Sequence, residues 1–116
     1  MKKYPTYPLE LKRAKYKGKD VGIYLTSYAI GGYPALIIGD EETQSTVAKC
    51  TLQLDNQKQD ECIVKDYSEN EGMYDFLLSE GIINKYHRFE GSGYVSKIPV
   101  CYLSDYSNSI LSKQDS

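Results

Sequence analysis

The sequence has no tryptophan, two phenylalanines and one histidine, His87, among its 116 residues. Histidine is the side chain that most often supplies a base near neutral pH, so a single copy leaves little material for a catalytic site. No run approaches the roughly 18 apolar residues of a membrane-spanning helix. Lys2 and Lys3 are not followed by the apolar stretch of a secretory signal. These shortages predict a cytoplasmic protein that is not an enzyme and does not enter a membrane.

Cysteine is also scarce, with only Cys50, Cys62 and Cys101 and no C-x-x-C pair. Three scattered cysteines and one histidine do not supply a four-ligand zinc set of the usual kind. Each cysteine stands in an apolar, strand-like run, which is typical of a small buried side chain. We therefore expect no metal, no cofactor and no disulfide.

Tyrosine, in contrast, is abundant, with twelve copies. Its ring covers apolar surface while its hydroxyl reaches water or a partner, and tyrosine is enriched where proteins touch other molecules. This composition predicts a domain that works by contact rather than by chemistry.

Alternation of apolar and polar residues predicts a series of strands. The predicted strands cover residues 8–12, 21–26, 34–38, 46–54, 62–65 and 94–103. The Gly31-Gly32 pair predicts a hairpin turn between the second and third strands. Pro5 and Pro8 place the first strand at a sheet edge, and Pro99 indicates an edge or a bulge for the last one.

The hydrophobic period changes after residue 67. Ser68 and Glu71 have the spacing of a capping box. The apolar residues that follow at helical spacing are Met73, Phe76 and Leu77. Gly81 stands where a glycine commonly ends a helix. The pattern predicts a helix over residues 69–80 and a linker over 84–90.

The predicted fold is α+β, a twisted, mainly antiparallel sheet of about five to six strands with one helix packed on a face. Residues 1–106 are expected to form one domain, and residues 107–116 a polar, partly ordered C-terminal tail.

Charge is unevenly distributed. Residues 1–20 carry seven lysines and arginines against two acids, whereas the remainder carries seven against fourteen. The cations that would form a nucleic-acid-binding arm are Lys2, Lys3, Lys12, Arg13, Lys15, Lys17 and Lys19, interleaved with Tyr4, Tyr7 and Tyr16. The other interpretation, which we favour, is an edge strand protected by lysines.

Residues 55–80 hold eight acids and two lysines. The candidate partner-binding residues here are Asp66, Tyr67, Glu69, Glu71, Tyr74 and Asp75. Acids interleaved with tyrosines can imitate a nucleic-acid backbone and occupy a basic channel on another protein, by electrostatic steering and aromatic anchoring. The simpler interpretation is that the first acids cap a helix and the rest remain solvated.

Other motifs favour ordinary structural roles. His87, flanked by cations, is interpreted as a surface-loop residue rather than as a base beside Asp75 or Glu80, or a partner of Cys101. The segments Gly31-Gly32 and Gly91-Ser92-Gly93 are expected to be turns rather than phosphate cradles, since no helix follows them. The Asp40-Glu41-Glu42 run is likewise expected to be a hairpin turn rather than a metal site.

Several segments resemble a known family. The matching segments are Asn70, Tyr74-Asp75-Phe76-Leu77, Glu80-Gly81-Ile82, Gly91-Ser92-Gly93-Tyr94-Val95 and Pro99-Val100-Cys101-Tyr102, and the upstream Leu9-x-Leu11, Tyr16 and Ile23-x-Leu25. They resemble a small bacterial family from conjugative elements and phages, catalogued as domain of unknown function 4313. The middle strand departs from the family pattern at Cys50-Thr51-Leu52-Gln53-Leu54.

The resemblance implies an accessory protein of a mobile element and assigns no catalytic residue. We therefore expect a non-enzymatic protein-interaction module, an anti-defence inhibitor of the anti-CRISPR type that binds a host protein. The alternatives are a nucleic-acid-binding accessory protein that uses the basic N-terminal segment, and a small enzyme around His87.

Overall fold

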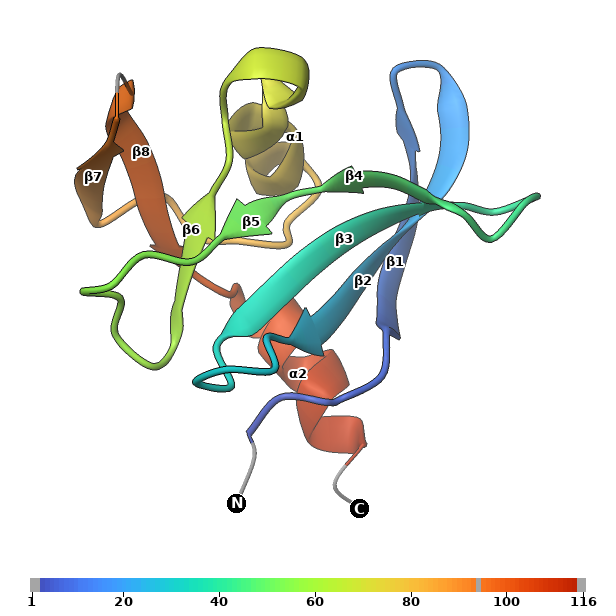
Figure 1. Ribbon diagram of the computed structural model, residues 1–116. Helices are drawn as coiled ribbons and strands as arrows, with labels where there is room; N and C mark the ends of the chain where they lie inside the picture. Colours follow the sequence, from blue (N-terminus) through green and yellow to red (C-terminus); the bar gives the residue numbers. More distant parts are fainter. Residues whose placement is uncertain (1–2, 94, 115–116) are drawn as a thin grey trace.

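The computed structural model describes residues 3–93 and 95–114, and within them eight strands form two antiparallel sheets (Figure 1). The first sheet contains β1 (Leu9–Tyr16), β2 (Lys19–Ser27), β3 (Pro34–Asp40) and β4 (Thr46–Lys49), in that order. The second contains β5 (Thr51–Leu52), β6 (Glu61–Val64), β8 (Val95–Tyr102) and β7 (Arg88–Ser92), in that order. The helical elements are the 3₁₀ turn η1 (Ser68–Asn70), α1 (Met73–Ser79) and α2 (Asp105–Lys113). The α+β class is confirmed, but the described residues form two sheets and two α-helices instead of one of each.

The first hairpin follows from its turn residues. Lys17 and Gly18 both have positive φ, 53° and 79°, and Tyr16 pairs with Lys19. A two-residue loop with both φ angles positive matches the right-handed twist of the strands it joins. β1 lies at the edge of its sheet, as its prolines predicted.

The segment predicted as one strand over residues 46–54 changes partner at Cys50. The Cys50 N–H donates to the Leu36 carbonyl of β3 at 2.9 Å, and the Cys50 carbonyl accepts from the Lys65 N–H at 2.8 Å. β4 therefore pairs with β3, and β5 pairs with β6. Period-two alternation gives the buried face of a strand but not its neighbours, so the change of sheet was not predictable.

The main core lies between the two sheets and under the helices. Ile23, Leu25 and Ile38 enter it from the first sheet, and Met73 and Leu77 enter from α1. The three cysteines are free and fully buried, which confirms their interpretation as small core side chains. Burial raises the pKa of each thiol.

A smaller cluster covers the other face of the second sheet. It is formed by Ile63, Ile98 and Val100, with Tyr67 and Leu52 packed against it. The second sheet therefore carries apolar clusters on both of its faces, and its strand β6 is buried throughout.

The helix predicted over residues 69–80 is shorter and begins differently. η1 ends before Gly72, whose φ of 91° interrupts the helix, and α1 starts at the next residue. The capping-box prediction is wrong, because neither Ser68 nor Glu71 provides a side-chain cap. Asp66 accepts from the Tyr74 N–H at 2.9 Å instead, and so satisfies a free donor of the first turn of α1.

The end of α1 is as predicted. Gly81 has a φ of 75°, its N–H donates to the Leu78 carbonyl, and the Ile82 N–H donates to the Leu77 carbonyl. This pair of bonds is a Schellman motif, which needs a residue that tolerates the left-handed conformation. Phe76, in contrast, is only half-buried, with its ring edge-on to Tyr16 at 4.9 Å, so it lies at the margin of the helix face it was predicted to anchor.

The segment predicted as a polar tail contains α2 (residues 115–116 lie outside the described part). The helix buries Ser107 and Leu111. The Ser107 hydroxyl donates to the Ile82 carbonyl at 2.8 Å, and the Ser104 hydroxyl donates to the Gly81 carbonyl at 2.6 Å. The prediction failed because the inner face of α2 is attached largely by serine hydroxyls, which leave a weak hydrophobic pattern.

Ser104→Ala is expected to lower the free energy of unfolding by about 0.5–2 kcal/mol, the usual cost of losing an N-cap. Ser104 accepts from the Ser107 N–H at 3.1 Å at the start of α2, so its loss leaves that donor without its cap. Urea unfolding followed by circular dichroism measures the change. Ser112→Ala, an exposed site in the last turn of α2, is the control. Equal effects of the two substitutions would contradict the assigned cap.

The final hairpin differs from its prediction. Residues 84–90, predicted as a linker, contain the start of β7. β8 lies between β6 and β7, so of the two alternatives predicted from Pro99 the edge position is wrong, whereas the register of β8 with β7 is irregular between Val95 and Ile98, next to the proline. Pro99 has no N–H to donate. It is tolerated because the pairing of β8 with β6 ends at Val100, the next residue along the chain, and does not include the proline. Tyr94, predicted to begin the last strand, lies outside the described residues.

Candidate protein-binding surface

The candidate acids differ in whether they form an ion pair. Glu69 forms an ion pair with Lys65 at 2.6 Å, and this bond lowers the pKa of its carboxyl group. Within residues 3–93 and 95–114, Asp66, Glu71 and Asp75 have no ion-pair partner. Glu71 and Asp75 are also exposed. Two exposed carboxylates without an ion-pair partner in the described residues, those of Glu71 and Asp75, therefore lie around the start of α1.

The two candidate tyrosines are both half-buried. Tyr67 packs against the smaller cluster of the second sheet, and the Lys65 ammonium lies 5.7 Å from its ring centroid. Tyr74 accepts a hydrogen bond from the Tyr86 N–H at 3.1 Å through its hydroxyl. Tyr74, unlike Tyr67, therefore lies beside the loop that leads into β7.

A row of aromatic rings continues from Tyr74. Its ring centroid lies 5.9 Å from that of Tyr86, which lies 4.2 Å from that of Phe89 on the edge strand β7. Phe89 is 42% exposed, and Leu78, one helical turn after Tyr74, is 37% exposed. We call Tyr74, Leu78, Tyr86 and Phe89 the α1–β7 patch.

Only Tyr74 of this patch was a candidate from the sequence. Tyr86 and Phe89 stand in the segment predicted as a linker, and Leu78 was not singled out as an exposed residue. The one available signal was the spacing of aromatic residues in Tyr86-His87-Arg88-Phe89. Exposed apolar side chains that adjoin one another and are rimmed by charge are typical of a protein-binding surface.

The cations of the predicted nucleic-acid arm are dispersed and paired. Lys2 lies outside the described residues. The ion pairs of the others are Lys3–Asp60, Lys12–Glu80, Arg13–Glu10, Arg13–Glu41, Lys15–Asp20 and Lys19–Asp40. Lys17 donates to the Glu69 carbonyl. Tyr4 and Tyr16, expected to interleave with these cations, are buried, while Tyr7 is exposed.

His87 lies in the loop before β7, and its ring has partners that the sequence did not predict. Its Nε2 lies 2.7 Å from Glu61 rather than beside Asp75 or Glu80, and its ring stacks on Tyr102 with centroids 4.2 Å apart. The imidazole is 29% exposed, whereas the Glu61 side chain is 1% exposed. The surface-loop interpretation is confirmed, because His87 lies exposed in the loop before β7, but its ring nitrogen also contacts a buried carboxylate.

Glu61 is saturated with hydrogen bonds. Its carboxylate accepts from Arg88 Nη2 at 2.6 Å and Nε at 3.0 Å, from the Lys58 N–H at 2.9 Å, and contacts His87. Hydrogen bonds from Arg88 are the main cause that lowers its pKa to about 2. Arg88 also pairs with Glu90. This cluster joins β6 to β7 and to the loops that precede these two strands. Because the Glu61 carboxylate already has hydrogen-bond partners on both oxygens, we interpret the cluster as structural.

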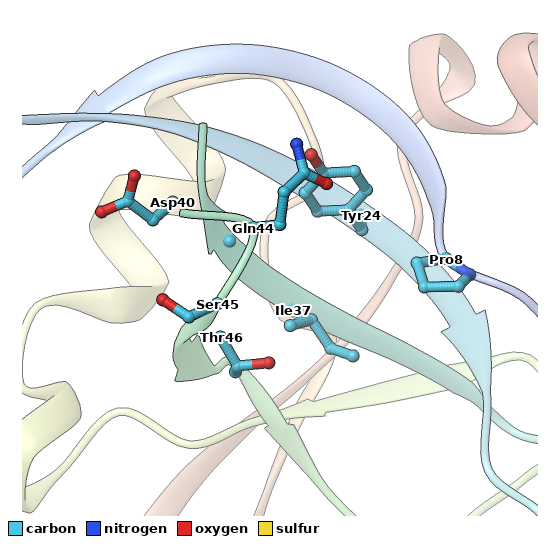
Figure 2. A pocket seen from close by; sticks show the side chains of 8 residues that line it. Pro8, Tyr24, Ile37, Asp40, Gln44, Ser45 and Thr46 are labelled. Carbon is cyan, nitrogen blue, oxygen red and sulfur yellow. The ribbon is translucent and has the colours of Figure 1, made fainter. Parts of the chain in front are cut away.

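A hollow of about 150 Å³ lies on the outer face of the first sheet, and Figure 2 shows its lining side chains. Tyr24 lies flat there, so that a Cβ added at Gly22 would be 2.8 Å from its hydroxyl. The turn after β3 closes the hollow, with Asp40 accepting from the Glu42 and Thr43 N–H groups. The turn interpretation of residues 40–42 is thereby confirmed.

Of the two glycine-rich motifs predicted as turns, Gly31-Gly32 forms one, whereas Gly91 and Ser92 end β7 and only Gly93 lies in a turn. Gly31 and Gly32 have φ angles of 84° and 68°, and the Tyr28 N–H donates across them to the Tyr33 carbonyl. Within residues 3–93 and 95–114 no cluster of His, Cys, Asp and Glu side chains is arranged to hold a metal ion. In the same part of the chain no helix has the length and apolar character needed to cross a membrane.

Comparison with protein-family models, with curated proteins and with solved structures found no match for this chain. The surface is therefore interpreted from its own contacts and charges, and membership of the mobile-element family stays a prediction.

Proposed function

We propose that this protein is a non-enzymatic interaction module of a phage or mobile element, an inhibitor of the anti-CRISPR type that binds a host defence protein. The observation that carries the proposal is the segregation of charge. In the described part of the chain, Glu71 and Asp75 are exposed without an ion-pair partner next to the aromatic α1–β7 patch, whereas five N-terminal cations, Lys3, Lys12, Arg13, Lys15 and Lys19, each form an ion pair.

This arrangement suits a partner with a basic surface. Unpaired acids steer a cationic surface into contact, and a central aromatic group supplies most of the binding energy once water is excluded. A host protein that binds nucleic acid presents such a surface, and covering it would block its activity. Nucleic-acid binding by this chain itself has weaker support, because each ion pair of the arm must break before its cation meets a phosphate.

The proposal predicts that the immobilised chain captures a nucleic-acid-binding protein from a bacterial lysate and prevents that protein from binding its nucleic acid. A Glu71→Lys/Asp75→Lys variant is expected to slow association several-fold, because rim charges act mainly on the association rate. The measurement is competition between the chain and labelled nucleic acid for the captured protein, at two salt concentrations.

The matched control is Glu42→Lys/Asp55→Lys, which makes the same charge change at two exposed, unpaired acids outside this surface. Inhibition by the control variant should match that of the wild type. If the captured protein retains its nucleic acid at full strength, the inhibitor function is wrong. If the chain alone binds DNA or RNA in a salt-sensitive way, the N-terminal arm is the functional surface instead.

A further inference from the structure

We infer that the α1–β7 patch docks a protein segment that carries lysine or arginine beside apolar side chains. The inference rests on the proposed function and adds the surface and the chemistry of the segment that binds it. It combines an apolar contact area, formed by neighbouring rings, with a rim of unneutralised acids.

The apolar part is built by α1, by β7 and by the loop that precedes β7. Tyr74 and Leu78 lie one turn apart on α1, Tyr86 packs on Tyr74, and Phe89 packs on Tyr86. The rings are fixed from within, because the Tyr74 hydroxyl is bonded to the backbone of Tyr86. A rigid aromatic surface binds with little loss of side-chain entropy, which is the property of interface hot spots.

The charged part selects a cationic partner. Asp75 follows Tyr74 directly, and Glu71 precedes the first turn of α1. Neither has an ion-pair partner in the described part of the chain. The ammonium of Lys85 lies 5.7 Å from the centroid of the Tyr86 ring, so this ring already attracts a cation within the chain itself. A lysine or arginine of a partner would find the carboxylates of Glu71 and Asp75 here, and would compete with Lys85 for the Tyr86 ring.

Other occupants fit this surface less well. Nucleic acid would bring phosphates toward Glu71 and Asp75, and a second copy would bring its own acids toward them, so both contacts place like charges together. Addition of a strand to β7 is disfavoured because the register of this short edge strand shifts between Glu90 and Ser92. A segment with both basic and apolar side chains avoids like-charge contacts, and it packs on the rings without pairing with the backbone of β7.

The test uses a synthetic amphipathic peptide of roughly four helical turns, with leucine on one face, arginine flanking it and one tryptophan. The chain has no tryptophan of its own, so the fluorescence of the probe reports binding directly. Amide chemical-shift mapping of the full chain identifies the contact surface even when binding is weak. We expect shifts confined to Asp75, Leu78, the Tyr86 region and Phe89.

Phe89→Ala and Leu78→Ala are each expected to weaken binding of the peptide about tenfold. Both side chains are partly exposed, and a thermal melt verifies that the variants remain folded. The matched aromatic control is Tyr7→Ala, since Tyr7 is 51% exposed and belongs to no part of the patch. It should bind the peptide as the wild type does.

No shifts, shifts located elsewhere, or equal binding of a peptide in which glutamate replaces arginine would overturn the inference. The two proposals can fail separately. Capture of a host protein that is unaffected by Phe89→Ala would reject the docking surface while the inhibitor function stands. Peptide binding at the patch without displacement of nucleic acid from any captured protein would reject the inhibitor function while the docking surface stands.

Discussion

Replacing Glu61 with glutamine is expected to lower the free energy of unfolding by about 3–5 kcal/mol, the range found when one partner of a buried ion pair is removed. The substitution leaves Arg88 and His87 without the carboxylate that joins them, and it places a neutral amide where both Arg88 and the Lys58 N–H donate. Chemical unfolding at neutral pH measures the loss. Glu10→Gln, which removes an exposed partner of Arg13, is the control and should cost no more than about 1 kcal/mol.

The same carboxylate predicts an acid limb in the stability of the wild type. Its pKa falls from 4.5 when unfolded to about 2 when folded. Between these values the unfolded chain binds more protons, so stability rises with pH. The contribution of Glu61 is complete above pH 4.5 and is lost as pH falls toward 2. Glu61→Gln should flatten this limb, and an unchanged acid limb would show that the carboxylate is not held as described.

Leu77→Ala is expected to destabilise the protein by about 2–5 kcal/mol, because it opens a cavity at a fully buried site. The adjacent Leu78 is the matched control, with the same side chain on the same helix but 37% exposure. Leu78→Ala should change the free energy of unfolding by no more than about 0.5 kcal/mol. Thermal and urea unfolding measure both. Similar losses for the two variants would mean that α1 presents a different face to the core.

The parts of the fold that the sequence predicts are those governed by local rules. The turn at Gly31-Gly32 and the helix end at Gly81 follow from backbone conformations that few residues adopt, and the edge position of β1 follows from prolines, which have no N–H to donate to a neighbouring strand. The burial of Leu77 and of the three cysteines follows from the apolar periodicity.

The parts that the sequence does not predict depend on distant partners. Glu61 was counted among the acids of a solvated segment, and only the arrival of Arg88 and His87 across the sheet makes it a buried one. α2 was missed because hydroxyl groups of Ser104 and Ser107 hold it to the carbonyls after α1. Phe89 was missed because an edge strand of five residues leaves little period-two signal.

The junction at Cys50 has a consequence for how the molecule opens. The Cys50 N–H is bonded to Leu36 of the first sheet, and its carbonyl is bonded to Lys65, which follows β6 of the second sheet. Cys50 thus ties the ends of β4 and β5 to both sheets. We therefore expect the Cys50 and Lys65 amides to exchange with solvent at similar rates, through openings that involve both sheets. The expected result is that the chain opens as one cooperative unit, with slowly exchanging amides on both sides of that single residue.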